Sequence, residues 1–158
     1  SNWGIYNGFE LCENRALPGR EEYADSEKYE LKVWDWDRPG NIKPLIRTLN
    51  LARKNNPALQ EYDNLEFYWA DHEDIIVYGK STPDLSNIVV AVVNLNPFQI
   101  RETLVHIPPH KLGVGDGEHY TVHDLISGER WGWRGHSNYV RLDPHLDPAH
   151  LFVIERNR

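Results

Sequence analysis

The second half of the chain is a succession of short apolar runs whose side chains alternate with a period of two. These runs cover residues 66–70, 74–80, 87–95, 102–107, 119–125, 138–142 and 150–155. Turn-forming pairs such as Asn96-Pro97 and Ser127-Gly128 separate them, and no helical pattern intervenes. Many short strands joined by turns are typical of an antiparallel β-sandwich, so we predict a mainly β fold for this half.

One of these runs differs from the others because residues 88–93 are apolar at every position. A strand that is apolar on both faces is typical of a position covered on both sides, whereas the run at 102–107 alternates between unlike residues. We therefore expect the run at 87–95 to lie at the centre of the sheet.

A single amphipathic helix precedes the strands, over residues 42–54. The apolar residues that share its predicted buried face are Ile42, Leu45, Ile46, Leu49 and Ala52. Asn41 is placed to cap the helix, Pro44 falls in its first turn, and Pro57 follows its end. A lone helix needs something to cover its apolar face, so we expect this face to pack on the β domain.

The stretch before the helix, residues 14–38, is polar, acidic and without periodicity. Its clustered carboxylates are Glu21, Glu22, Asp25, Glu27 and Glu30. Paired carboxylates can serve as acid and base in glycoside hydrolysis. Nothing in the sequence fixes two of them across a cleft, however, so a solvated acidic loop is the favoured interpretation from the local sequence alone.

Charge and composition exclude several classes of function. A net charge of -7 without clustered basic residues argues against binding to nucleic acid. No apolar run approaches the ~20 residues of a membrane span. Cys12 is the single cysteine, which favours a reducing cytoplasm. The chain starts in the middle of an apolar pattern at residues 3–11 and contains no methionine, so we expect a segment of a longer protein.

Histidine and tryptophan offer two further candidate sites. The eight histidines include His119 and His123 on one strand face, but no cysteine pair or HExxH motif accompanies them, so we predict no metal site. Trp131 and Trp133 lie in a possible hairpin with their side chains on the same face. They could stack on sugar rings or pack in a core, and the sequence leaves both open.

Several segments together resemble a known enzyme family. YNGFELCE at residues 6–13, EEYADSEKYELK at 21–32 and ARKNNPAL at 52–59 resemble the maltosyltransferases of glycoside hydrolase family 13, the α-amylase family. The resemblance runs through the chain to GHSNYVRLDPHLDPAHLFVIE at 135–155, and DSEKYE at 25–30 is its most specific part.

The resemblance implies a domain organisation. Residues 1–58 would be the end of a catalytic (β/α)8 barrel, with the tail of its last strand at 6–11, a loop at 12–38 and its last helix at 42–54. Residues 59–158 would be the all-β C-terminal domain. Because barrel active sites are built from loops that follow the strands, the acidic loop would then border the active site.

The resemblance also implies substrates and site residues. The family transfers maltosyl units from α-maltose 1-phosphate to α-1,4-glucan by a retaining mechanism, and Lys28 and Tyr29 match residues that contact the sugar of the donor subsite. The family's catalytic carboxylates lie on earlier barrel strands, so this chain would contain no catalytic residue and would be inactive by itself. The implied enzyme needs no cofactor or metal, is cytoplasmic, and is compatible with a homodimer of the full-length protein.

Two alternatives remain open at this point. The parent protein could be an α-amylase-type hydrolase, because the choice between transfer and hydrolysis depends on subsites outside this sequence. The β domain could instead be an α-glucan-binding module or a purely structural one. Exposed aromatic side chains would favour binding, and buried ones would favour the structural role.

Overall fold

The computed structural model describes residues 4–24 and 31–156. The chain forms two compact units, residues 2–48 and residues 49–158. The larger unit contains all the strands named below, and the smaller one contains most of the acidic segment.

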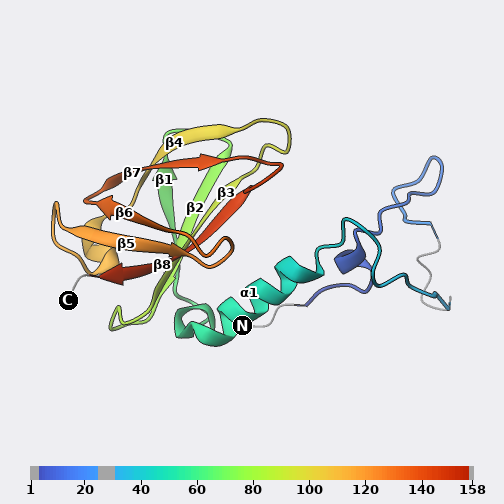
Figure 1. The fold of residues 1–158 in the computed structure, drawn as a ribbon, viewed down its shortest axis with the longest axis horizontal. Coiled ribbons are helices and arrows are strands. Elements are labelled where there is room, and N and C mark those ends of the chain that lie inside the picture. Colours follow the sequence, from blue (N-terminus) through green and yellow to red (C-terminus); the bar gives the residue numbers. More distant parts are fainter. Residues whose placement is uncertain (1–3, 25–30, 157–158) are drawn as a thin grey trace. The chain divides into compact units, whose positions relative to one another are not determined.

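The larger unit is an antiparallel β structure of eight strands. They are β1 (Leu65–Ala70), β2 (Ile75–Ser81), β3 (Ile88–Asn94), β4 (Arg101–His106), β5 (His119–Asp124), β6 (Arg130–Arg134), β7 (Ser137–Leu142) and β8 (Ala149–Arg156). Their order in the sheet is β6-β5-β8-β3-β2-β1-β4-β7 (Figure 1). The two ends of this order, β6 and β7, follow one another in the chain, so the sheet curls into a barrel-like sandwich. The predicted fold class is confirmed.

The centre of the sheet is β3, as its uninterrupted apolar run predicts. It pairs with β2 on one side and β8 on the other. Val90 and Val92 are completely buried, and Val90 lies opposite Phe152 in the register with β8. The core continues through the inward positions of the other strands, including Val105, Tyr120 and Val122.

The structure contains one strand, β6, that is not among the seven predicted runs. Gly132 interrupts the apolar pattern of β6, which the sequence indicates only as part of a possible hairpin. In the structure Gly132 lies opposite Thr121, and Trp131 and Trp133 lie opposite Val122 and Tyr120. Pairing with β5 therefore makes this segment a strand.

The helix α1 (Lys43–Asn55) forms within one residue of its predicted bounds. The Asn41 Oδ1 atom accepts a hydrogen bond from the Lys43 amide at 3.2 Å, which satisfies one of the unpaired amides of the first turn. At the other end, the Asn56 side chain donates to the Ala52 carbonyl oxygen at 2.8 Å, and Pro57 follows. These capping and stop signals are confirmed.

The predicted burial of the helix's apolar face is wrong for most of its members. Only Ala52 is buried, while Ile42, Ile46 and Leu49 are half-buried and Leu45 is 40% exposed. Periodicity identifies which side chains share a face of a helix. It does not supply the surface that would cover that face, and in this structure the cover is incomplete.

The smaller unit departs from the strand expected at residues 6–11. Phe9–Leu11 forms a short 3-10 helix instead. Gly8 adopts a left-handed conformation with φ 97°, and its carbonyl oxygen accepts hydrogen bonds from the Leu11 and Glu13 amides, both at 3.1 Å. These local hydrogen bonds fold the chain into a turn, so it does not extend as a strand. The assignment of residues 1–58 to a barrel, and a domain boundary at 58/59, stay predictions.

Candidate functional site

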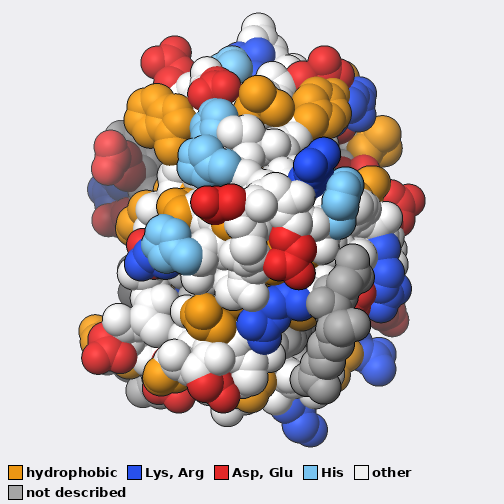
Figure 2. Space-filling view, turned by 90° about the vertical axis from the view of Figure 1, so that its left-hand side faces the viewer, with side chains coloured by type: hydrophobic (Ala, Val, Ile, Leu, Met, Phe, Trp, Pro, Cys, Tyr) orange, Lys and Arg blue, Asp and Glu red, His pale blue; other side chains and the backbone are white. Residues whose placement is uncertain are grey.

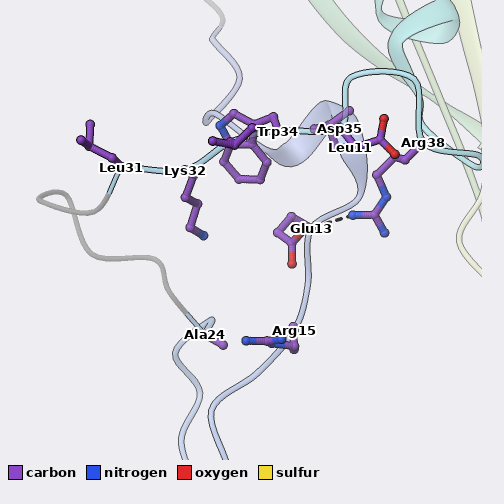
Figure 3. Close-up of a pocket in the computed structure, with 10 residues that line it drawn as sticks. Leu11, Glu13, Arg15, Ala24, Leu31, Lys32, Trp34, Asp35 and Arg38 are labelled. Atoms are coloured by element: carbon purple, nitrogen blue, oxygen red, sulfur yellow. Dashed lines mark hydrogen bonds and ion pairs between the residues drawn. The ribbon is translucent and has the colours of Figure 1, made fainter.

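The smaller unit contains an open cavity of about 520 Å³ (Figure 3). Two stretches line most of it, residues 11–15 and residues 31–38. The lining residues are Leu11, Glu13, Arg15, Ala24, Leu31, Lys32, Val33, Trp34, Asp35 and Arg38. The lining combines one large aromatic ring with three cations and two carboxylates, so it can offer an apolar face, N–H donors and oxygen acceptors to a polar small molecule.

The aromatic wall of this cavity is Trp34, and its position depends on a glycine. A Cβ atom on Gly8 would lie 2.8 Å from the Trp34 ring, so the ring can pack here only because Gly8 has no side chain. The Lys32 ammonium lies 5.1 Å from the centre of the Trp34 ring, a cation–π contact. The cavity therefore combines an apolar ring face with a fixed positive charge.

An ion pair links the two stretches that line the cavity. The Arg38 Nη1 atom lies 3.1 Å from the Glu13 Oε2 atom, and both side chains are partly exposed (Figure 3). Asp35 is engaged locally, because its carboxylate accepts a hydrogen bond from the Asp37 amide. With Glu13 held by Arg38, these contacts do not place two carboxylates across a substrate as glycoside hydrolysis requires.

Lys28 and Tyr29, the residues matched to the donor subsite, lie outside the described residues. The described chain stops at Ala24 and resumes at Leu31, and both of these residues line the cavity. The cavity residues Lys32, Trp34 and Arg38 were not selected from the sequence. The sequence feature that could have indicated them is the alternation of charged and aromatic residues in KVWDWDR at 32–38. This pattern is not typical of a solvated acidic loop.

A second cavity, of about 470 Å³, lies in the larger unit between β6 and β7. Trp131 and Trp133 both line it, so the prediction that they share a strand face is confirmed. Trp133 is 6% exposed and packs edge-on against Phe152 at 5.1 Å between ring centres, so it belongs to the core. Trp131 is half-buried and keeps part of its ring at the cavity.

Two of the histidines, His106 and His150, are held by hydrogen bonds in separate parts of the larger unit. His106 bonds to Asp71 and Ser137, both at 2.8 Å, and His150 bonds to Asp124 at 3.0 Å. Among the residues that the structure describes, no three His, Cys, Asp or Glu side chains are grouped to hold a metal ion. On the face shown in Figure 2, histidines are interspersed with acidic and basic side chains, and no large patch of one charge covers it.

Comparison with known proteins gives consistent results. The family model described as "GLGE, C-terminal" matches residues 67–154. The chain is 47% identical over its whole length to an alpha-1,4-glucan:maltose-1-phosphate maltosyltransferase of Myxococcus xanthus, of which it covers 24%. It is 47% identical over 154 residues to the protein of the same name in Rhodospirillum rubrum, of which it covers 22%. The chain thus spans about a quarter of the length of the curated relatives that it matches.

Solved structures with a similar fold include two α-amylases. A maltogenic alpha-amylase of Thermotoga neapolitana aligns with 98% of this chain and 33% of its own, with a TM-score of 0.61 and 14% identity. An Anoxybacillus alpha-amylase aligns with 77% of this chain and 24% of its own, with a TM-score of 0.52 and 14% identity. At this identity the likeness shows the fold alone. Within the described ranges, no helix has the length and apolar character to cross a membrane.

Proposed function

The chain belongs to the family described as "GLGE, C-terminal", and from this membership we propose that it is part of an enzyme that transfers maltosyl units from α-maltose 1-phosphate to α-1,4-glucan. The observation that carries the proposal is the 47% identity, over the whole chain, to a relative named for this reaction. The aligned region includes the acidic segment as well as the β domain, because it spans all 158 residues.

The smaller unit would contribute to the sugar-binding site of this enzyme. Trp34 offers a flat apolar face for a sugar ring, and Lys32 and Arg38 offer N–H donors for hydroxyl or phosphate oxygens. We also assign Lys28 and Tyr29 to the donor subsite of this enzyme, since DSEKYE at residues 25–30 matches the family's motif. A Lys ammonium and a Tyr ring with its hydroxyl suit the same polyhydroxyl ligand.

The catalytic carboxylates of this enzyme would come from another part of the protein. A retaining transfer requires a nucleophile and an acid/base residue about 5–5.5 Å apart. The Glu13 carboxylate of the cavity is instead paired with Arg38, and Asp35 accepts a backbone hydrogen bond. The isolated chain is therefore expected to bind no transition state and to be inactive, while its N-terminal unit holds the donor sugar in place.

The test compares the full-length protein with the isolated chain, using α-maltose 1-phosphate as donor and glycogen as acceptor. We expect the full-length protein to release phosphate and lengthen glucan chains, and the isolated chain to do neither. Release of free maltose without chain extension would favour an α-amylase-type hydrolase instead. Turnover by the isolated chain would refute the assignment of the carboxylates to another part of the protein.

Location and assembly belong to the same proposal. We place the enzyme in the cytoplasm, because Cys12 is the single cysteine of this chain and is exposed as a free thiol. A homodimer of the full-length protein is the assembly that we propose. Light scattering on the purified full-length protein measures this directly, and a monomeric mass would contradict it.

A further inference from the structure

The sheet of the larger unit has a seam where its two end strands meet. Across β6 and β7, both fully described, no ladder of backbone hydrogen bonds is formed. Only their turn end is tied together: the Arg134 amide donates to Asn138 Oδ1 at 2.9 Å, and Asn138 Nδ2 donates to the Tyr120 hydroxyl at 3.1 Å. Beyond this clamp the strands diverge (Figure 1), and the cavity of about 470 Å³ lies between them.

The inner wall of this cavity is a fixed aromatic surface. Trp131 is held edge-on by His150 and Phe152, with ring centres at 5.4 and 5.8 Å. His150 is itself stacked on Phe152 at 5.0 Å and fixed by its bond to Asp124. Because Trp131 is half-buried and braced from behind, its exposed part is already in place for a ligand.

The rim of the cavity is polar and carries both signs of charge. Arg141 is held by Glu102 at 3.4 Å and by Asp143 at 3.5 Å, which leaves its guanidinium fixed at the edge. Asp147, which also lines the cavity, is exposed and pairs with Asp143 in an isolated β-bridge. A rim of this kind supplies donors and acceptors to a neutral ligand with many hydroxyls, whereas the exposed Asp147 carboxylate would repel an anion and would be left unsatisfied by a lipid.

We propose that this seam cavity is a second carbohydrate site, which binds a segment of the α-glucan acceptor. An apolar sugar face would lie on Trp131, and the sugar hydroxyls would bond to Arg141 and Asp147. The volume falls within the range of about 300–1,000 Å³ typical of small-molecule sites. The choice of α-glucan among carbohydrates rests on the proposed function. The site would hold long acceptors near the enzyme without taking part in the transfer step.

The test measures glycogen binding and short-acceptor turnover separately, in the full-length protein. The variants are Trp131→Ala and Trp131→Phe, with Asp147→Ala at the exposed rim. The matched control is Trp69→Ala, because Trp69 is 70% exposed and lies outside the cavity. Losing one stacked ring is expected to weaken retention on a glycogen affinity gel by about tenfold. Trp131→Phe keeps a smaller ring and should lose less, while the control should match the unmodified protein.

Turnover of α-maltose 1-phosphate with a short maltooligosaccharide should be unchanged in all variants, because the seam cavity does not hold the reacting sugar. Trp131→Ala and Asp147→Ala could retain glycogen as well as the unmodified protein does, with normal turnover. That result would refute the carbohydrate site in the seam cavity and leave the proposed transferase function standing. Weakened retention in a protein that never turns over the donor would support the cavity and refute the proposed transferase. If Trp131→Ala does not fold, Asp147→Ala and Trp131→Phe decide between these outcomes.

Discussion

The His150 Nδ1 atom lies 3.0 Å from the Asp124 Oδ2 atom, and the two side chains are only 10% and 1% exposed. The same carboxylate also accepts hydrogen bonds from the Leu151 amide at 2.9 Å and the Ser127 hydroxyl at 2.8 Å. Asp124 thus joins the end of β5, the turn that follows it and β8. Through His150 it also braces Trp131 at the seam cavity.

The first prediction concerns acid stability. Burial by itself raises the pKa of Asp124, but hydrogen bonds from His150 and from neighbouring amides outweigh burial and lower this pKa from 3.8 to about 2. Because the folded-state pKa is below the unfolded value, this carboxylate contributes stability above pH 3.8 that is lost as the pH falls toward 2. Asp124→Asn should lower the free energy of unfolding at pH 7 by about 2 kcal/mol, as measured by urea titration.

The pH series provides the control for this prediction. The difference between unmodified protein and Asp124→Asn should shrink between pH 4 and pH 2, as the native carboxylate takes up its proton. Asp116→Asn, at an exposed position, should follow the unmodified protein throughout. A difference that stays constant down to pH 2 would show that the asparagine acts only through packing.

The second prediction tests the packing of Trp34 against Gly8. Gly8→Ala introduces a Cβ atom 2.8 Å from the ring and also places alanine at φ 97°. Gly19→Ala is the matched control, since Gly19 also has a positive φ, of 70°, but open space around it. A left-handed alanine alone costs roughly 1–2 kcal/mol, so Gly8→Ala should cost more than Gly19→Ala.

Amide hydrogen exchange measures this difference at the residues that are bonded to Gly8. The Leu11 and Glu13 amides, both bonded to the Gly8 carbonyl oxygen, should exchange faster in Gly8→Ala than in Gly19→Ala. Equal exchange rates in the two variants would mean that the Trp34 ring moves aside without cost, and the aromatic wall of the cavity would then not be fixed.

The third prediction concerns the clamp at the seam. Burial raises the pKa of Tyr120 to about 12, although its hydrogen bond with Asn138 opposes this shift. Since the folded-state pKa is above the unfolded value of 10.0, the stability contributed by neutral Tyr120 is present below pH 10.0 and is lost as the pH rises through about 12. Burial also raises the pKa of Tyr68 to about 12, so ultraviolet titration should show two tyrosines ionising near pH 12, and only one of them should remain in Tyr120→Phe.

Tyr120→Phe should also lower the free energy of unfolding by about 1 kcal/mol, because it removes the two part-buried hydrogen bonds that the Tyr120 hydroxyl makes with Asn138 and Gly135. Tyr62→Phe, at a position 81% exposed, is the control and should leave both the titration step and the stability unchanged. A late titration step of undiminished amplitude in Tyr120→Phe would show that Tyr120 does not contribute to it.

The fourth prediction tests the assigned donor subsite in the full-length enzyme. Lys28→Ala removes an ammonium that we assign to the sugar or its phosphate, so kcat/KM for α-maltose 1-phosphate should fall by tenfold or more, about 1.4 kcal/mol. Tyr29→Phe keeps the ring, so its loss should be smaller. Lys54→Ala, on the exposed side of α1, is the control. Unchanged kinetics in Lys28→Ala would remove Lys28 from the subsite.

The local structure of the chain could be predicted because its signals are local. The cap at Asn41, the helix stop before Pro57 and the uninterrupted run of β3 depend on residues that are neighbours in sequence. The strand β6 was not predicted as one of the runs, because its status depends on pairing with β5 across Gly132. The cavity of the smaller unit was also not predicted. It depends on the Trp34 ring packing against Gly8, and the segment between these residues has no periodicity that would indicate this contact.

By itself, the sequence determined the fold class, the central strand, the helix bounds and the resemblance to a maltosyltransferase, because period, turn residues and motifs are all written along the chain. Only the tertiary structure decided that Trp133 is core while Trp131 faces a cavity, and that the apolar face of α1 is covered mainly at Ala52. The physical reason is the same in both cases. Periodicity fixes the direction of a side chain, whereas burial depends on what lies opposite, and that surface comes from residues distant in the sequence.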